Sequence, residues 1–233
     1  GSERRIKFRV ILKDQEGVDP DEVIMNPARA RERGLTSTVI FPTGNIAPEG
    51  AIIKSTALDP AVVGDDGIYR MKGPAKVFSS EESAIVAIKD GEIVAGDVMV
   101  LTGIGPMGTG MEETYQVTSA LKFLSFGKQV AVVTDGRFSG VSTGACIGHV
   151  GPEALAGGPI GKIQDGDIIQ IEIDRNNNRG SLDLVGTKEE ELTTKEGAQL
   201  LSSRGPRDDL APHPLLPDDT RLWAALQAQS GGT

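Results

Sequence analysis

The chain has 233 residues, of which 38% are hydrophobic and 4% aromatic, so it can form one large domain or two small ones around an aliphatic core. Its formal net charge of −9 argues against nucleic acid as a partner, and no apolar run reaches the roughly 18 residues of a membrane span. A single cysteine, Cys146, excludes an internal disulfide and is typical of a reducing, cytoplasmic compartment.

The N-terminal quarter of the chain contains patterns for three strands and one helix. A half-buried strand is predicted over 6–12, where four apolar residues alternate with polar ones: Ile6, Phe8, Val10 and Leu12. Asn26-Pro27 is a typical helix start and predicts a short helix that stops at Gly34. The stretches "STVIF" (37–41) and "AIIKSTA" (51–57) predict two further strands.

The middle of the chain contains both helices and buried strands. Ser79 and Glu82 have capping-box spacing and predict the start of a helix that ends at Gly91. Two buried strands are expected in apolar runs, at 96–101 and 129–135. Between them, a helix is predicted over 112–124, with four residues turned inward: Tyr115, Val117, Ala120 and Leu121.

The C-terminal part begins with a short helix that opens at Pro152 and ends at Gly157. The alternating stretch 166–173, the turn "RNNNRG" and the stretch 181–186 predict a hairpin. Two more helices are expected, near 194–203 and over 219–229. Hairpins and helical crossovers together indicate an α/β fold with mixed sheets and helices on one side, not a doubly wound sheet.

Gly103, Gly105 and Gly108 spell G-x-G-x-x-G between a predicted strand and a predicted helix, and three interpretations are open. Dinucleotide binding has the expected context, but Glu112 and Glu113 in a first helical turn would repel a pyrophosphate. In the second, purely structural interpretation, the glycines make only a tight connection, and the glutamates only favour the helix start. In the third interpretation one glutamate binds Mg²⁺, which takes one or two protein carboxylates together with water and substrate oxygens.

A second loop, 134–162, leaves the next buried strand and concentrates polar side chains among glycines, which is a common arrangement in active sites. Ser139 lies in F-S-G and not in G-x-S-x-G, so an esterase elbow is not supported. His149 is interpreted first as a core histidine, and Cys146 as a small buried apolar residue.

Five longer stretches are more specific than the glycine triplet: "GNIAPEGAIIK", "GPAKVF", "GIGPMGTGMEE", "TDGRFSG" and "GHVGPEALAGGPIGKIQDGD". Over roughly residues 35–187 the chain closely resembles the C-terminal part of the dihydroxy-acid and 6-phosphogluconate dehydratase family. The stretches "MEETYQVTSALKFLSFGK" and "LPDDTRLWAALQAQSGGT" resemble most the aldonate branch of that family, the D-xylonate dehydratases.

The resemblance implies removal of water from a 2,3-dihydroxy acid, which gives a 2-keto-3-deoxy acid. It implies Mg²⁺ and an iron–sulfur cluster, [2Fe–2S] or [4Fe–4S], as cofactors. The family holds the cluster by cysteines of an N-terminal domain, and Cys146 does not match them. The chain is therefore expected to be one part of such an enzyme, inactive alone. Alternatives are a dihydroxy-acid dehydratase of branched-chain amino-acid synthesis and a nucleotide-binding module that uses the Gly103–Gly108 loop.

By motif match, the resemblance implies that Glu113 is a Mg²⁺ ligand and that Ser139 is the catalytic base, acting as an alkoxide. Ser142 and Thr143 are expected to donate hydrogen bonds to the substrate. Five further residues are expected to shape the two loops, with Asp135 and Arg137 as an ion-paired brace: Gly105, Gly108, Gly110, Asp135 and Arg137.

The resemblance also implies a swivelling β/β/α domain, with barrel-like mixed β-sheets flanked by helices. This domain is expected over 1–187, followed by a C-terminal helical extension over 188–233. The expected partners are a sugar-acid substrate, the N-terminal cluster domain and identical subunits, with neither nucleic acid nor membrane.

Overall fold

The computed structural model describes residues 1–33, 38–217, 222, 225–226 and 229. Contacts divide the chain into two compact units, Gly1–Ser37 and Thr38–Thr233, which we describe separately. The predicted helix over 219–229 lies largely outside the described residues. No helix in the described part of the chain is both long and apolar enough to cross a lipid bilayer.

The first unit is helical and consists of α1 (Ser2–Asp14), α2 (Pro20–Val23) and α3 (Pro27–Glu32). The strand predicted over 6–12 is wrong, because these residues lie within α1. Residues two apart lie about 200° apart around a helix, so the alternating apolar side chains form no single stripe and none is buried. The helix after Asn26 is confirmed, since the Asn26 side chain accepts a hydrogen bond from the Arg29 amide at 3.0 Å.

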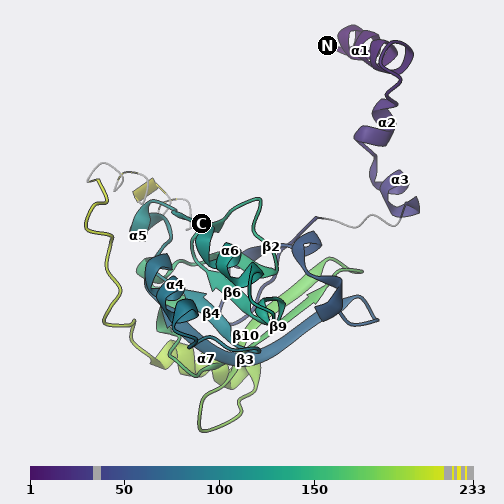
Figure 1. The fold of residues 1–233 in the computed structure, drawn as a ribbon. Coiled ribbons are helices and arrows are strands. Elements are labelled where there is room, and N and C mark those ends of the chain that lie inside the picture. The colour runs from purple at the N-terminus through teal and green to yellow at the C-terminus, as the bar shows by residue number, and fades with distance from the viewer. Residues whose placement is uncertain (34–37, 218–221, 223–224, 227–228, 230–233) are drawn as a thin grey trace. The chain divides into compact units, whose positions relative to one another are not determined.

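The second unit is built on an eight-stranded mixed sheet with the order β1-β2-β8-β6-β4-β3-β9-β10 (Figure 1). Its strands are β1 (Val39–Ile40), β2 (Gly50–Lys54), β3 (Ile68–Phe78), β4 (Val98–Leu101), β6 (Ala131–Thr134), β8 (Ala145–Gly151), β9 (Ile168–Asp174) and β10 (Arg179–Gly186). The long strand β3 joins two halves: residues 68–74 pair antiparallel with β9, and residues 75–78 pair parallel with β4. The predicted hairpin corresponds to β9 and β10.

The two ends of the sheet approach each other and nearly close a ring. Thr43, three residues after β1, forms a parallel bridge with Ser181 in β10. The Thr43 amide donates to the Gly180 carbonyl at 3.2 Å, and the Leu182 amide donates to the Thr43 carbonyl at 3.0 Å. The predicted barrel-like mixed architecture is therefore confirmed.

Side-chain alternation along the strands fills two separate cores. In β9, Ile169, Ile171 and Ile173 are fully buried and join a core enclosed by the strands. In β4, Val98 and Val100 face that core, whereas Met99 and Leu101 face a second core beneath helices. This strand is apolar throughout because both of its faces are covered.

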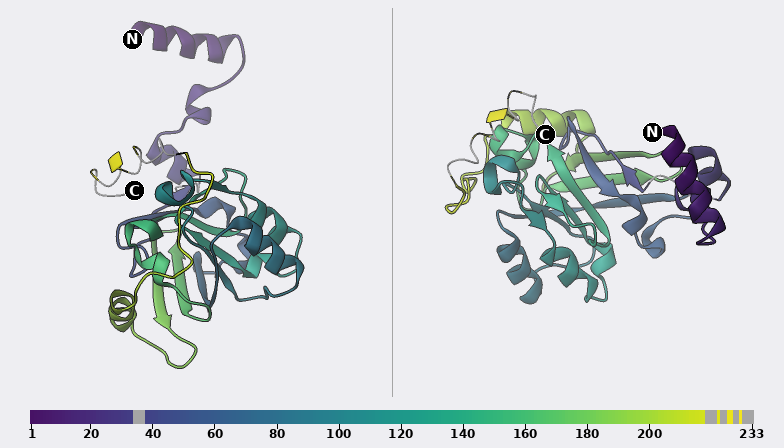
Figure 2. Two further views of the ribbon diagram at one scale, coloured as in Figure 1. Left: turned by 90° about the vertical axis from the view of Figure 1, so that its left-hand side faces the viewer. Right: turned by 90° about the horizontal axis from the view of Figure 1, so that it is seen from above.

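Two helices cover the second core: α4 (Glu81–Lys89) and α6 (Gln116–Lys122) (Figure 2). The helix predicted after Ser79 exists, but its predicted cap is wrong. The side chain of Ser80, not Ser79, accepts a hydrogen bond from the Ser83 amide at 3.1 Å. The polar start of α4 therefore lies one residue later than the S-x-x-E spacing indicates.

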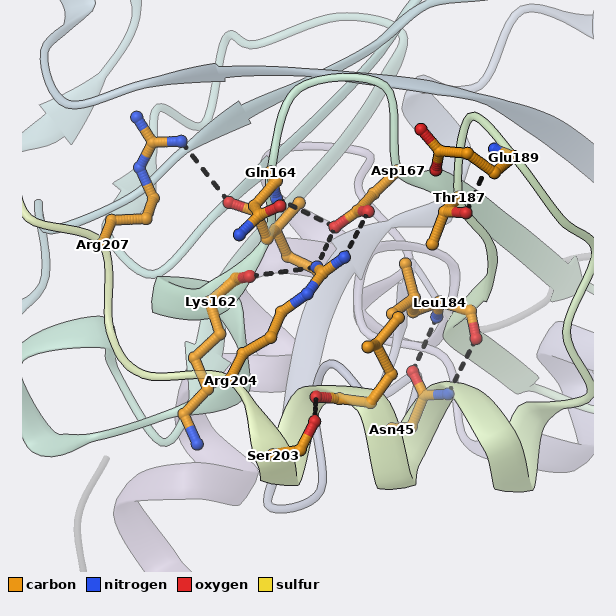
Figure 3. A network of polar contacts seen from close by, with 12 residues as sticks. Asn45, Lys162, Gln164, Asp167, Leu184, Thr187, Glu189, Ser203, Arg204 and Arg207 are labelled. Carbon is orange, nitrogen blue, oxygen red and sulfur yellow. Dashed lines mark hydrogen bonds and ion pairs between the residues drawn. The ribbon is translucent and has the colours of Figure 1, made fainter.

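The helix predicted near 194–203 is α7 (Thr194–Ser203), which begins with a capping box formed by Thr193 and Glu196. Arg204, directly after it, binds the buried Asp167 with both guanidinium nitrogens, at 2.5 and 3.0 Å (Figure 3). Asn45 exchanges hydrogen bonds with the backbone of Leu184, at 2.6 and 2.9 Å. These contacts attach α7 and the segment after β1 to the strands.

Candidate active site

The candidate site lies where two parallel strands end. β4 and β6 are neighbours in the sheet, and their last residues, Leu101 and Thr134, are register partners. The loops that follow, 102–115 and 135–144, therefore leave the sheet at the same edge. Ligand sites in mixed and parallel sheets are commonly found at this edge.

The two loops pair through a small parallel sheet of β5 (Glu113–Thr114) and β7 (Arg137–Phe138). Glu113 is the register partner of Arg137, and the Ser139 amide donates to the Thr114 carbonyl at 3.4 Å. Thr114 is buried and Phe138 packs on the second core, so alternation turns Glu113 and Arg137 outward. The predicted metal ligand therefore lies on β5, and the predicted base directly follows the neighbouring strand β7.

This pairing corrects the helix predicted over 112–124, which begins only at Gln116. Gly110 and Met111 both have positive φ angles, 73° and 70°, and turn the chain out of the short helix α5 (Pro106–Thr109). Tyr115, predicted to face inward, is 46% exposed. The glutamates do not lie in a first helical turn, so the helix-dipole argument does not apply to them.

The carboxylate that serves the start of α6 is Glu81 of α4. One of its oxygens accepts hydrogen bonds from the amides of Tyr115 and Val117, at 2.8 and 2.9 Å. This contact satisfies free donors of the first turn and ties the two covering helices together. Because Glu81 lies more than 30 residues earlier in the chain, no local pattern points to it.

Asp135 holds the glycine loop by its backbone. Its buried carboxylate accepts hydrogen bonds from the amides of Gly103 and Ile104, both at 3.0 Å, and of Ala154 at 2.9 Å. Burial raises the pKa of Asp135, although these three donors act to lower it. The brace predicted between Asp135 and Arg137 is not what the structure shows: Arg137 lies 4.0 Å from the Glu113 carboxylate instead.

The occupied amides also count against the nucleotide interpretation. A phosphate cradle needs free backbone donors, but Asp135 already binds those of Gly103 and Ile104. The Met107 amide is bound by both carboxylate oxygens of Glu153, at 3.0 and 3.1 Å. Acidic side chains therefore take the positions where phosphate oxygens would be expected.

The three loop-shaping glycines lie at tight positions. A Cβ on Gly108 would lie 1.8 Å from the Gly103 carbonyl oxygen, and a Cβ on Gly105 would lie 2.2 Å from a Glu153 carboxylate oxygen. Gly110 ends α5 in the left-handed region. Larger residues would move the backbone that leads to Glu113.

A pair of titratable side chains without a predicted role lies beside this loop. Glu153 and His149 line a small cavity of about 40 Å³ together with Asp135, Pro106, Met111 and Val150. Burial raises the pKa of Glu153 to about 7, with a further contribution from the Asp135 charge. Burial also lowers the pKa of His149, whose ring stands edge-on to Phe138 with centroids 6.3 Å apart. The motif "GHVGPEA" contains both residues, but periodicity alone assigns them no function.

We define residues 139–144 as the serine loop. The Ser142 amide donates to the Ser139 carbonyl at 2.9 Å, and the Val141 amide approaches the Ser139 hydroxyl oxygen at 3.4 Å. Ser142 is buried and accepts a hydrogen bond from the Thr118 hydroxyl at 3.1 Å. Thr143 is exposed and lines a separate cavity of about 500 Å³ on the flank of the loop. The structure thus brings Ser139 near Glu113, whereas Ser142 is turned into the interior.

Glu113 can serve as one ligand of Mg²⁺, whereas Cys146 does not fit an iron–sulfur cluster. Glu113 is 42% exposed, and among the described residues no three acidic, histidine or cysteine side chains form a metal site. A single accessible carboxylate suits Mg²⁺ only if other oxygens complete the coordination. Cys146 is buried in the second core, where burial raises the pKa of its thiol to about 12, so it is unsuited to hold an iron–sulfur cluster.

The nearly closed ring of strands and the two loops paired at its strand ends define a mixed α/β domain, and comparison with known proteins identifies its family. Residues 23–210 match the family model described as "Dihydroxy-acid/6-phosphogluconate dehydratase C-terminal". The chain belongs to this family, which confirms the predicted resemblance.

Curated relatives agree with this assignment. The chain is 62% identical over 232 residues to the D-xylonate dehydratase YagF of Escherichia coli K12, covering 100% of this chain and 35% of that protein. It is 61% identical over 234 residues to the D-xylonate dehydratase YjhG of the same organism, covering 100% and 36%. A dihydroxy-acid dehydratase of Renibacterium salmoninarum is 37% identical over 214 residues, covering 91% and 35%. The chain thus spans about a third of the length of these relatives.

Proposed function

We propose that this chain is the substrate-side domain of an aldonate dehydratase that converts D-xylonate, or a closely similar sugar acid, into a 2-keto-3-deoxy acid. The observation that carries this proposal is the pairing of β5 with β7, which places Ser139, directly after β7, next to the strand that bears Glu113. The identity with two D-xylonate dehydratases supports the choice of substrate.

In this function Ser139 removes the proton from C2 of the substrate. A serine hydroxyl is a very weak acid, so its alkoxide needs donors and positive charge nearby. The Val141 amide donates to the hydroxyl oxygen at 3.4 Å, and Arg137 lies two residues earlier in the chain, in β7. Mg²⁺, when held in part by Glu113, would spread the negative charge that develops beside the substrate carboxylate. The leaving hydroxide needs a second Lewis acid, for which this chain has no ligands, so we assign that role to the cluster domain of the whole enzyme.

The first test of this proposal is Ser139→Ala in the complete enzyme. We expect kcat for D-xylonate to fall by about a thousandfold or more, because no other described hydroxyl takes the same position at the end of β7. The control is Ser125→Ala, which removes an exposed hydroxyl elsewhere and should leave kcat within about twofold. Near-normal turnover by the Ser139 variant would exclude it as the base.

Glu113→Gln tests the metal ligand separately. We expect the Mg²⁺ concentration needed for half-maximal activity to rise by about 10- to 100-fold, since the amide keeps the shape but loses the charge. Glu112→Gln is the matched control, because its carboxylate is also exposed and lies one residue away. Equal Mg²⁺ dependence in the two variants would contradict the role of Glu113.

Substrate assays and a ligand titration distinguish the competing functions. A branched 2,3-dihydroxy acid assayed beside D-xylonate distinguishes the dihydroxy-acid dehydratase alternative, and the higher kcat/KM identifies the substrate. Calorimetric titration with NAD⁺ tests the nucleotide alternative. We expect no binding, because acidic side chains occupy the loop amides.

A further inference from the structure

The lysine at the end of β2 reaches across to the serine loop. The Lys54 ammonium group donates a hydrogen bond to the Gly140 carbonyl at 2.8 Å, directly after Ser139. β2 pairs antiparallel with β8, with Ile53 opposite Ile147, so the end of β2 lies beside the start of β8. Because the serine loop runs into β8, the main sheet holds the end of β2 and the end of the serine loop together.

The loop has separate attachments at its beginning, tip and end. The Ser139 amide donates to Thr114 at the beginning, and the Gly144 amide donates to the Ala57 carbonyl at 3.0 Å at the end. The tip consists of Gly140 and the exposed Val141, and a Cβ added at Gly140 would meet nothing within 4 Å. Among the described residues outside the loop, Lys54 provides a side-chain hydrogen bond to this open tip.

The contact also brings a positive charge close to Ser139. Since Gly140 directly follows Ser139, the ammonium nitrogen lies within about 10 Å of the serine backbone. The screening length in physiological salt is about 8 Å, so the charge favours an anionic oxygen there only weakly, and more strongly at low salt. A lysine has three donors, and the contact with Gly140 uses one of them.

We propose that Lys54 is a positioning residue: it fixes the tip of the serine loop through the Gly140 carbonyl and keeps a cation beside the Ser139 alkoxide. This rests on the proposed function of Ser139. It gives the motif "GNIAPEGAIIK" a role, because the strand that the motif forms ends at the loop that bears the base.

The first experiment measures the loop without any turnover. Hydrogen exchange is followed at the Ser142 and Gly144 amides of the chain carrying Lys54→Met. We expect the Ser142 amide, whose acceptor lies at the loop start, to exchange about tenfold faster, while Gly144, held by Ala57, changes less. Lys128→Met is the matched control, because Lys128 pairs with Asp59 at 3.2 Å and not with the serine loop. Equal Ser142 exchange in the two variants overturns the proposal.

The second experiment measures the charge in the complete enzyme. At low ionic strength, Lys54→Met should shift the acidic limb of the kcat/KM profile for D-xylonate upward by about half a pH unit, whereas Lys54→Arg, which keeps the charge, should restore it. A purely structural role predicts lower activity with an unshifted limb in Lys54→Met, and that result overturns the electrostatic part.

The Ser139→Ala variant separates the two proposals. If it keeps normal turnover, Ser139 is not the base and the proposed function fails, while faster Ser142 exchange in Lys54→Met still supports the loop attachment. If Ser139→Ala is inactive, while Lys54→Met exchanges at Ser142 like Lys128→Met and leaves the acidic limb unshifted, the proposed function stands and the inference about Lys54 fails.

Discussion

At the scale of single residues, Glu153 and Asp135 together set the course of the glycine loop. Each carboxylate binds backbone amides of the segment 103–107, and no side-chain cation accompanies them in their small cavity. Buried acids held by neutral donors are costly to ionise. Their contribution to stability must therefore depend on pH.

The pKa of Glu153 predicts the direction of that dependence. Its value is about 7 in the folded chain against 4.5 for a free glutamate, so the folded state binds more protons between these values. The free energy of unfolding should consequently fall as the pH rises from about 4.5 to about 7. Glu153→Gln, which cannot ionise, should show a smaller fall in urea denaturation measured across this range.

Because Asp135 and His149 titrate in the same cavity, the contribution of Glu153 is obtained by comparing variants. Asp135 has a raised pKa and contributes a slope of the same sign, whereas His149 has a lowered pKa and contributes one of opposite sign below pH 6.5. Both are present in the parent and in Glu153→Gln, so the difference between the two curves reports Glu153 together with its electrostatic coupling to Asp135. Glu112→Gln should keep the parent slope, and identical slopes in all three proteins would contradict the assignment.

At the scale of elements, a buried ion pair anchors the C-terminal end of α7, in addition to Leu201 and Leu200, which pack on the core enclosed by the strands. Asp167 is 3% exposed and Arg204 14%, and Asp167 also accepts a hydrogen bond from the Gln164 amide. Losing one partner of such a pair leaves an uncompensated buried charge. We therefore expect Arg204→Ala to lower the free energy of unfolding by about 3 kcal/mol in chemical denaturation.

The comparison for Arg204 is an exposed ion pair on the same domain. Arg70 and Asp66 are both 51% exposed, so Arg70→Ala should cost less than about 1 kcal/mol. The double variant Arg204→Met, Asp167→Leu should recover much of the loss, because it removes the stranded charge. Equal unfolding midpoints for Arg204→Ala and Arg70→Ala would show that the buried pair does not hold α7.

Elements with a long regular pattern were predictable from the sequence, and those defined by distant pairing were not. The helix at 194–203 and the hairpin around "RNNNRG" have strong local signals and agree with the structure. The strands β5 and β7 have two residues each and exist only because loops 24 positions apart meet. A two-residue strand has no period to detect, and at β5 the sequence indicated the start of a helix over 112–124 instead.

The same distinction applies to the site. Motif resemblance pointed to Glu113, which lies on β5, and to Ser139, which directly follows the neighbouring strand β7. The partners Lys54, Glu81 and Glu153 come from other elements and become visible only in three dimensions. Resemblance points to the residues that we propose for the chemistry, but the residues that hold them in place are set by tertiary contacts.

At the scale of the whole molecule, the division of chemistry predicts that this chain alone is inactive. It contains one cysteine, and that cysteine is buried, so it offers no ligand set for a cluster. Incubated with D-xylonate, Mg²⁺, iron and sulfide, the chain should form no keto acid by semicarbazide assay. The complete enzyme under the same conditions is the control, and turnover by the chain alone would refute this division.

The ring of strands also affects how copies of the molecule meet. The outer strands of an open sheet expose rows of unpaired backbone groups, which recruit strands from other molecules. Here the outermost strands, β1 and β10, are joined through the bridge between Thr43 and Ser181, so the described eight-stranded sheet has little free backbone to offer. Its topology itself guards against edge-to-edge aggregation, while Glu113 and the tip of the serine loop remain exposed.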